Sequence, residues 1–283
     1  MKKTIGLIGA GGLIGTALMN HFESKYLVRS IKSNLLYSKP TELMSVLEGL
    51  DVIINLAGYP IAGRWNKRIK KKIYDSRVKT TKNIVHAINL LEIKPTHYIN
   101  ASAIGIYDDG IICDEISKHI SDNFLSRLVK DWEQEVLQIK NVNYTVIRLG
   151  VVLSRKGGAY SMLRRIFKLG IGGPLGSGNQ GFSFILIDDL IRVFDFIIEN
   201  DIYGIVNGVS PTPSTNREFS LKLAKRLRRP VFFRVPSVML KLILGEGAIT
   251  VLKGQKVIPK ILLDKQFTFD GNNLNDCLTI LEK

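Results

Sequence analysis

The sequence predicts an α/β fold, in which a doubly wound parallel sheet is joined to a smaller mixed C-terminal lobe. Three observations predict it. Short apolar segments alternate with amphipathic ones up to about residue 150, as in successive βαβ units. The segment Asp51–Ala57 is almost wholly apolar, which is typical of a parallel strand buried on both faces. After about residue 150 the alternation of apolar and amphipathic segments stops. Gly and Pro gather in Gly170–Gly181, which favours a loop.

The elements follow in order from these patterns. Strands are expected at Thr4–Ile8, Tyr26–Ile31, Asp51–Ala57, His97–Ser102, Tyr144–Leu149 and Gly204–Asn207, with a degenerate strand at Asn34–Tyr37. Helices are expected at Leu13–Glu23, Glu42–Leu47, Lys67–Leu91, Asp122–Ile139 and Asp188–Glu199. Asp188-Asp189 is expected to cap the last of these. A further helix is expected to begin at a cap residue, Ser214 or Thr215, and to run to Leu227. We therefore expect a first domain over 1–155. Residues 156–283 would form the second lobe, with a helical C-terminal extension and some strands returning to the main sheet.

Composition excludes several classes of protein. With 283 residues and 45% hydrophobic content, the chain is expected to fold rather than remain disordered. Cys113 and Cys277 form neither a disulfide framework nor a metal-ligand spacing, and the four His residues are scattered, so no metal is expected. No apolar run reaches the length of a membrane span and no signal peptide is evident. We expect a cytoplasmic protein that does not bind a membrane.

The formal net charge of +15 is unusual, and it is typical of proteins that bind nucleic acid or an acidic membrane surface. The basic residues are nevertheless spread along the chain. Their densest run, Arg64–Lys72, lies in an expected helix. Two interpretations remain, a solvated helix face that attracts an anionic cofactor or substrate, and a polynucleotide site. No nucleic-acid motif supports the second, so we expect no nucleic-acid partner.

A glycine-rich turn connects the first strand to the first helix. Gly9, Gly12 and Gly15 have G-x-x-G-x-x-G spacing. The first allows a sharp turn, the second lets a pyrophosphate approach the backbone, and the third allows close helix packing. The N–H groups at the helix start, including those of Leu13 and Ile14, favour phosphate. The strand–turn–helix context predicts a Rossmann fold that binds a dinucleotide; the alternative is a tight turn without ligand.

The end of the second strand distinguishes between cofactors. NAD enzymes usually place an acid there for the ribose hydroxyls, and NADP enzymes a basic residue for the 2′-phosphate. The stretch Val28–Ser33 holds no acid, and Lys32 stands at the expected position. This favours NADP(H) over NAD(H), unless Lys32 is an ordinary solvated loop residue.

Further segments point to a family. Asn55-Leu56-Ala57-Gly58 resembles the N-x-A-G turn of short-chain dehydrogenases/reductases. The whole chain resembles the epimerase family proteins of the extended, atypical branch of that superfamily, which carry a helical C-terminal extension. The other segments that carry the resemblance are Asn55–Ile61, Arg64-Trp65-Asn66, Asp75-Ser76-Arg77, Thr80-Thr81, Trp132-Glu133, Arg148–Leu153, Gly170–Gly178, Asp188-Asp189-Leu190, Thr215–Phe219 and Gly254–Pro259.

The resemblance implies the cofactor contacts. Beside the turn Gly9–Gly15, the implied residues are Ile31, Lys32, Leu56, Ala57, Gly58, Arg77 and Leu153. Arg77 is suited to the role because a guanidinium bridges phosphate or ribose oxygens. Its alternative role is that of an ordinary surface ion-pair partner.

The usual catalytic pair of short-chain reductases is absent. A Tyr-x-x-x-Lys pair normally lies on one helix, where the Lys lowers the pKa of the phenol. Counting back from Trp132-Glu133, the two positions hold Leu125 and Val129. Ser102, at the end of a strand, and Tyr107 are then the candidate catalytic groups, although Tyr107 also suits packing at the base of the loop.

Two hypotheses for function remain. The first is an NADP(H)-dependent oxidoreductase or epimerase-like isomerase acting on a small polar substrate, with Ser102, Tyr107 or water as proton donor. The second is a non-catalytic NADP(H)-binding protein, either a redox sensor or a partner-binding module. The missing Tyr-Lys pair favours the second, whereas the Gly-rich loop at 172–178, suited to enclosing a substrate, favours the first.

Overall fold

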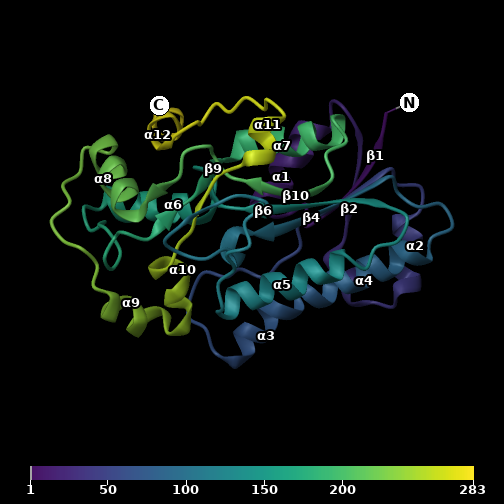
Figure 1. Ribbon diagram of the computed structural model, residues 1–283, viewed down its shortest axis with the longest axis horizontal. Helices are drawn as coiled ribbons and strands as arrows, with labels where there is room; N and C mark the ends of the chain where they lie inside the picture. The colour runs from purple at the N-terminus through teal and green to yellow at the C-terminus, as the bar shows by residue number, and fades with distance from the viewer. Residues whose placement is uncertain (1) are drawn as a thin grey trace.

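A six-stranded parallel sheet forms the centre of the computed structural model, which describes residues 2–283 (Figure 1). Every pairing within this sheet is parallel, as the alternating sequence pattern predicts. In spatial order the strands are β10 (Gly204–Gly208), β6 (Asn143–Leu149), β4 (His97–Ala103), β3 (Val52–Asn55), β1 (Thr4–Ile8) and β2 (Leu27–Ile31). The sheet has the Rossmann-type α/β arrangement expected from the sequence.

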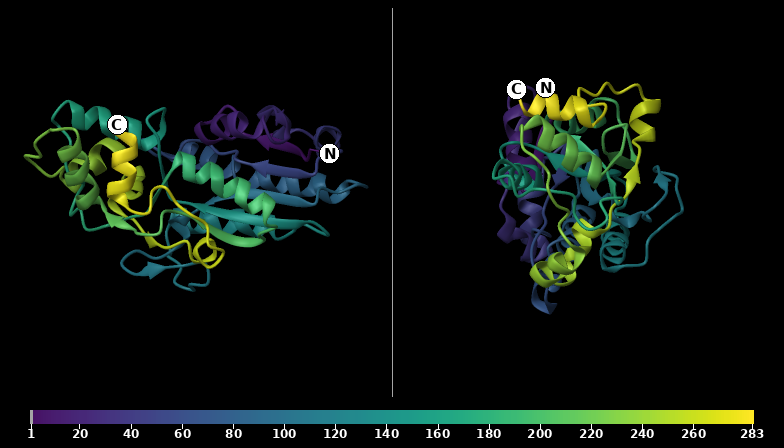
Figure 2. Two further views of the ribbon diagram at one scale, coloured as in Figure 1. Left: turned by 90° about the horizontal axis from the view of Figure 1, so that it is seen from above. Right: turned by 90° about the vertical axis from the view of Figure 1, so that its left-hand side faces the viewer.

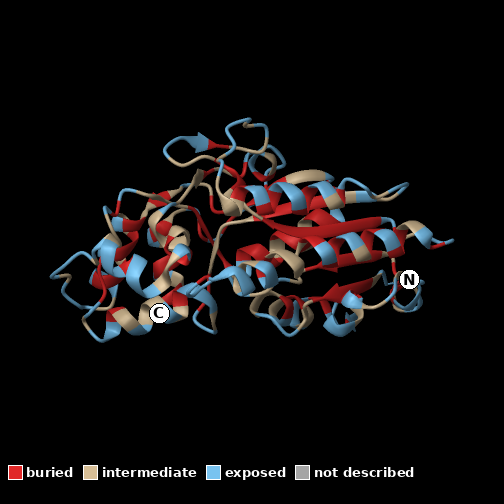
Figure 3. Ribbon diagram, turned by 90° about the horizontal axis from the view of Figure 1, so that it is seen from below, coloured by how far each residue is buried: buried red, intermediate tan, exposed pale blue. Residues whose placement is uncertain are grey.

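Helices cover both faces of the sheet (Figure 1). One face packs on α1 (Leu13–Phe22), α7 (Ile187–Glu199) and α11 (Lys260–Asp264). The other packs on α2 (Pro40–Leu47), α4 (Val78–Leu90) and α5 (Phe124–Val136). Ile53 and Ile54, neighbours in β3, enter opposite cores, which explains why that strand is apolar throughout. In Figure 3 the inner strands of the sheet are buried, and each helix turns its exposed side outward.

A smaller mixed lobe lies beyond the carboxyl ends of the strands, with its own core around Tyr160, Phe184 and Phe219. Its elements are β7 (Val151–Leu153), α6 (Gly158–Lys168), β8 (Gly181–Phe182), β9 (Phe184–Leu186), β11 (Ser214–Thr215), α8 (Asn216–Arg226) and α12 (Leu274–Leu281). Thr215 caps α8, because its hydroxyl accepts a hydrogen bond from the Glu218 N–H at 3.2 Å. Residues 170–181 are mainly loop, as predicted.

The C-terminal extension returns to the first domain. Its short elements are α9 (Ser237–Leu244), η3 (Glu246–Ala248), α10 (Ile249–Leu252) and β12 (Lys256–Val257), followed by α11. β12 pairs with β5 (Ile112–Cys113), and an isolated bridge joins Gly245 to Trp65. The extension is therefore only partly helical and is attached to both parts of the chain.

Two of the predicted elements are wrong in detail. Asn34–Tyr37 is not a strand but part of a 3₁₀ helix, η1 (Ser33–Tyr37), whose Leu36 enters the core beside α2 and α4. The expected helix Lys67–Leu91 is two helices, α3 (Lys67–Asp75) and α4, separated at Ser76 and Arg77. The break has a local cause, because the side chains of Ser76 and Arg77 both bind Tyr59 in the loop after β3.

Asp188-Asp189 was expected to cap α7, and this is also wrong. The helix begins at Ile187 and has no side-chain cap. Asp189 is instead fully buried, where its carboxylate accepts hydrogen bonds from the N–H groups of Asp270 (2.9 Å) and Gly271 (2.8 Å). It therefore fixes the C-terminal segment against α7.

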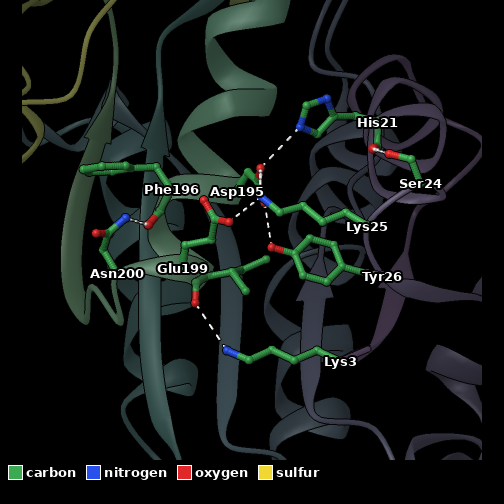
Figure 4. A network of polar contacts seen from close by, with 10 residues as sticks. Lys3, His21, Ser24, Lys25, Tyr26, Asp195, Phe196, Glu199 and Asn200 are labelled. Carbon is green, nitrogen blue, oxygen red and sulfur yellow. Dashed lines mark hydrogen bonds and ion pairs between the residues drawn. The ribbon is translucent and has the colours of Figure 1, made fainter. Parts of the chain in front are cut away.

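A polar network holds α1 and β2 against α7 at the amino end of the sheet (Figure 4). The Lys25 ammonium lies 2.7 Å from Asp195, and the Tyr26 hydroxyl donates to the same carboxylate at 2.7 Å. Burial raises the pKa of Asp195, but these partners outweigh it and the net pKa is lowered. The network lies at the opposite end of the sheet from the glycine turn and does not enter the candidate site.

Candidate functional site

The glycine turn has the geometry that a dinucleotide requires. Gly9 has φ +84°, a conformation that side chains other than glycine rarely adopt. Gly12 precedes the first residue of α1 and is exposed, and a Cβ there would meet only the Gly9 carbonyl oxygen, at 3.4 Å. Leu13 and Ile14, which are both partly exposed residues, follow with their N–H groups at the helix start. The turn therefore leaves its backbone open to a phosphate.

Gly15 serves the turn itself. A Cβ at this position would lie 2.2 Å from the Gly9 carbonyl oxygen and 2.7 Å from the Ala10 Cα. The third glycine thus allows the first turn of α1 to pack on the residues that precede it, more directly than on the sheet.

Lys32 stands at the end of β2, where the sequence placed it. Its side chain is exposed, and its backbone is extended (φ −67°, ψ 134°) before η1 begins. Ile31 is buried against α2 and the neighbouring strand. Of the two residues expected to contact the cofactor here, Lys32 is the accessible one.

The loop after β3 forms the next part of the site. Asn55 is buried, and its Oδ1 accepts a hydrogen bond from the Ala57 N–H at 3.0 Å. Its amide donates to Asn100 at 2.8 Å. Leu56, Ala57 and Gly58 thereby leave β3 in a fixed direction, with side chains or backbone partly accessible.

Arg77 lies against this loop, at the break between α3 and α4. Its Nη1 donates to the Tyr59 carbonyl at 2.9 Å, and a Cβ added to Gly58 would come within 3.0 Å of the guanidinium. Within residues 2–283 no carboxylate forms an ion pair with it, which excludes the role of a surface ion-pair partner. Burial lowers the pKa of Arg77 to about 10. A partly buried cation without a counter-ion suits an incoming phosphate.

A cavity of about 630 Å³ adjoins the glycine turn. It lies between α1, the segment Ser154–Gly157 and α12, and Arg155 and Lys156 contribute positive charge to its wall. Leu153, expected to contact the cofactor, is fully buried in the core of the second lobe. The structure therefore brings the residues that follow Leu153, rather than Leu153, to the surface beside the turn.

The helix that normally carries the catalytic pair is α5. Leu125 is partly exposed and Val129 is buried, so neither position offers a proton donor. Ser102 is 3% exposed, and its hydroxyl donates to Glu133 Oε1 at 2.6 Å. The Ser102 side chain therefore points under α5 rather than out of the sheet.

Tyr107 is 0% exposed, and both hydrogen-bonding directions of its hydroxyl are used. It donates to Asn207 Oδ1 at 2.9 Å and accepts from Arg148 Nη1 at 2.8 Å. Burial raises the pKa of the phenol, and Arg148 opposes this only in part. This is the reverse of the lowered pKa that a catalytic phenol requires.

A buried ion pair connects these two candidates, and sequence reasoning assigned it no role. Arg148 at the end of β6 pairs with Glu133 on α5 through Nε (2.9 Å) and Nη2 (2.6 Å). Both residues belong to segments that carry the family resemblance, so the sequence already singled out each residue. Their pairing was not, because it joins positions that are adjacent only in the folded sheet.

Two family descriptions match the chain. Residues 5–207 match the NAD dependent epimerase/dehydratase family, and residues 235–281 match a domain of unknown function, DUF1731. The human protein described as epimerase family protein SDR39U1 is 35% identical, over 96% of this chain and 97% of that protein. The SDR39U1 homolog of Arabidopsis thaliana, described as chloroplastic, is 35% identical over 98% of this chain and 86% of that protein.

Solved structures agree with these relatives. A crystal structure of human SDR39U1 (isoform 2) with NADPH superimposes with a TM-score of 0.90 at 31% identity, covering 99% of both chains. The dTDP-4-dehydrorhamnose reductase of Bacillus anthracis, solved in complex with NADP, has a TM-score of 0.79 at 16% identity and supports the fold alone.

Proposed function

Because the chain belongs to the NAD dependent epimerase/dehydratase family, we propose that it binds NADPH on the turn Gly9–Gly15 and acts as an NADP(H)-dependent oxidoreductase. The observation that carries the cofactor assignment is the open backbone of this turn, with an exposed Lys32 at the end of the adjacent strand. The human relative crystallised with NADPH supports it. The substrate would be a small polar molecule held between the sheet and the second lobe.

Each part of the cofactor has residues suited to it. The N–H groups of Leu13 and Ile14 would hold the pyrophosphate, and Gly12 would let it approach the backbone. Lys32 would neutralise the 2′-phosphate, and Arg77 would contribute a donor from the loop side. When bound, the nicotinamide supplies or accepts the hydride. The chain's own contribution is to bind the cofactor and orient it.

The proton for such a reaction would not come from α5. Leu125 and Val129 carry no acid, and the hydroxyls of Ser102 and Tyr107 are buried and already hydrogen-bonded. We propose that Ser102 and Tyr107 position the Glu133–Arg148 pair, and that water in the cleft exchanges the proton with the substrate.

The burial of the Ser102 and Tyr107 hydroxyls also favours a second candidate function, an NADPH-binding protein without turnover. A fold that keeps the cofactor site but buries both candidate hydroxyls suits a sensor of the NADPH level or a module that binds a partner. The two candidates differ in whether nicotinamide oxidation occurs.

We also propose that the protein works in a reducing compartment, because of its two cysteines. Cys113 and Cys277 are both free and buried, and burial raises the pKa of the Cys277 thiol to about 12. Unreactive, unpaired thiols suit a reducing compartment such as the cytoplasm.

The cofactor assignment is tested by reversing one charge. Lys32→Glu is expected to weaken NADPH binding at least about tenfold, since it replaces a phosphate partner by a repelling carboxylate, and to change NADH binding little. Lys82→Glu, an exposed reversal on α4, is the matched control. Titration of intrinsic fluorescence measures both cofactors. Equal weakening of NADPH and NADH by Lys32→Glu would reject the 2′-phosphate role.

Turnover is tested with pools of carbonyl compounds and nucleotide sugars, by following NADPH absorbance. The oxidoreductase proposal predicts consumption that survives in Ser102→Ala and Tyr107→Phe at temperatures where both variants are folded. Consumption abolished in either folded variant would make that hydroxyl the proton donor. Tight NADPH binding without NADPH oxidation in the presence of any pool would reject the oxidoreductase and support the non-catalytic function.

A further inference from the structure

One end of the second lobe combines exposed apolar side chains with uncompensated positive charge. It comprises residues 228–243, which connect α8 to α9 and include most of α9, together with Leu169 and Ile171 of the neighbouring loop. We call it the basic apolar end. The connection forms the left-hand margin of the molecule in Figure 1, and the right panel of Figure 2 looks directly onto it. It is remote from the N-terminal strand of the sheet.

The apolar side chains project from this surface. Phe232 and Phe233 are 70% and 82% exposed, and their ring centroids lie 6.3 Å apart. Of α9, only Leu240 is buried. The other exposed apolar residues here are Leu169, Ile171, Val238, Met239, Leu242 and Ile243. Scattered single apolar residues are ordinary at a protein surface, but a cluster of this kind marks an interaction site.

The segments of the cluster lie side by side. The Val235 N–H donates to the Pro174 carbonyl at 2.8 Å, and the Gly176 N–H donates to the Val235 carbonyl at 2.9 Å. A Cβ on Gly173 would lie 2.1 Å from the Phe233 carbonyl oxygen. The loop that carries Ile171 therefore runs directly beside the one that carries the two Phe residues. Pro230 and Pro236 flank that pair and restrict its backbone.

The charge of this end has one sign. Residues 219–245 include seven Lys or Arg and no Asp or Glu, although Lys222 is paired with Glu218. Arg228, Arg229, Arg234 and Lys241 are exposed, and within the part of the chain that the structure describes none of them forms an ion pair. Part of the net charge of +15 is thus concentrated around an apolar surface.

We propose that the basic apolar end docks on an anionic phospholipid surface, which replaces the expectation from the sequence that the protein does not bind a membrane. The aromatic and aliphatic side chains would enter the interfacial layer while the Arg and Lys side chains contact lipid phosphates. A second copy of the chain would bring two positive surfaces together. A polynucleotide would neutralise the charge but would leave Val238, Leu242 and Ile243 in water. Such association is peripheral, since no helix among residues 2–283 is long and apolar enough to cross a bilayer.

The proposal is tested by co-sedimentation with vesicles. The full chain is expected to sediment with equimolar phosphatidylcholine and phosphatidylglycerol, and to remain in solution with pure phosphatidylcholine. Binding should fall as salt is raised, because the charges are exposed. No binding to the anionic vesicles, or equal binding to both compositions, would overturn the proposal.

Two pairs of variants locate the surface. Phe232→Ser with Phe233→Ser removes the aromatic side chains, and Arg229→Glu with Arg234→Glu reverses two charges. Each double variant is expected to weaken vesicle binding at least about tenfold. The control for the first is Ile93→Ser, which removes a side chain that is 76% exposed on the other part of the molecule. Lys82→Glu is the charge control.

NADPH titration of every variant shows that the fold is retained, and it separates this proposal from that of the cofactor. Equal loss of vesicle binding in Ile93→Ser or Lys82→Glu would overturn the location. Light scattering and binding of a short single-stranded RNA complete the test. A dimer, or an RNA complex, that depends on Phe232 and Phe233 while vesicles are not bound would assign the surface to that partner instead.

Discussion

At the residue scale, Gly15 shows how one missing methyl group determines the cofactor turn. Its Cβ would lie 2.2 Å from a carbonyl oxygen that cannot move without opening the turn. We expect Gly15→Ala to destabilise the protein by about 1–3 kcal/mol through overpacking, and to weaken NADPH binding. Thermal unfolding of the free protein measures the first effect. The control is Gly11→Ala, since no atom lies within 4 Å of that Cβ position. Equal destabilisation by both variants would contradict the packing argument.

His97 gives a prediction in pH. It is buried beside β6, where its Nε2 lies 2.7 Å from the Thr145 hydroxyl, and burial lowers its pKa from 6.5 to about 4. The unfolded chain therefore binds a proton at His97 more readily than the folded protein does. The contribution of the neutral, buried His97 to stability is complete above pH 6.5. It is lost as pH falls to about 4, a change on the order of 3 kcal/mol.

Chemical denaturation at successive pH values checks this expectation. His97→Gln should remove much of the dependence between pH 6.5 and 4, whereas His86→Gln, at an exposed position on α4, should leave it intact. An unchanged pH profile in His97→Gln would assign the dependence to other groups.

The residues of the site differ in how far the sequence predicts them. Gly9, Gly12 and Lys32 follow from local pattern, because a turn and the strand end beside it are set by nearby residues. The burial of Ser102 and Tyr107 does not follow, since it depends on Glu133, Arg148 and Asn207, which only the assembled sheet brings together. The burial of the Leu153 side chain does not follow either, because the lobe core that covers it is distant in sequence.

At the scale of elements, the ion pair between α5 and β6 replaces the usual catalytic machinery with a structural contact. Removing one partner leaves a buried charge, so Arg148→Met or Glu133→Leu is each expected to cost about 3–5 kcal/mol of stability. The double variant should cost clearly less than the sum, since neither charge remains. Denaturant unfolding of the four proteins measures this coupling. Strict additivity would show that the two side chains are not coupled.

Element boundaries were predicted where they depend on local signals. Thr215 caps α8 as expected, whereas the break at Ser76 and Arg77 went unseen. The Ser76 hydroxyl accepts a hydrogen bond from the Tyr59 N–H at 2.8 Å, and Arg77 donates to the Tyr59 carbonyl. The amphipathic pattern runs on through this point, so only the loop after β3 reveals why the helix ends.

At the scale of the whole molecule, one buried carboxylate, that of Asp189, fixes the segment between α11 and α12 against α7. Asp189→Ala leaves the N–H groups of Asp270 and Gly271 without their acceptor, and is expected to cost about 3 kcal/mol. Limited proteolysis should then cleave the segment between α11 and α12. Asp188→Ala, at the exposed neighbouring position, is the control. Resistance equal to that of the unchanged protein would show that other contacts suffice.

The overall architecture was predictable because strand and helix alternate with clear periods, and the parallel sheet follows from that order. The path of the last fifty residues was not, because short helices and bridges such as Trp65 to Gly245 are set by the surfaces they meet.

The strand order also determines which parts of the sheet can form while the chain is being synthesised. β10 is the neighbour of β6 in the sheet, but residues 150–203 are made between them. At about 5–20 residues per second, the ribosome leaves the β6 edge without a partner for several seconds. During most of that time α7 is also missing from its face of the sheet. An open strand edge beside bare apolar side chains is a template for aggregation, so the nascent protein is a substrate for chaperones during this interval.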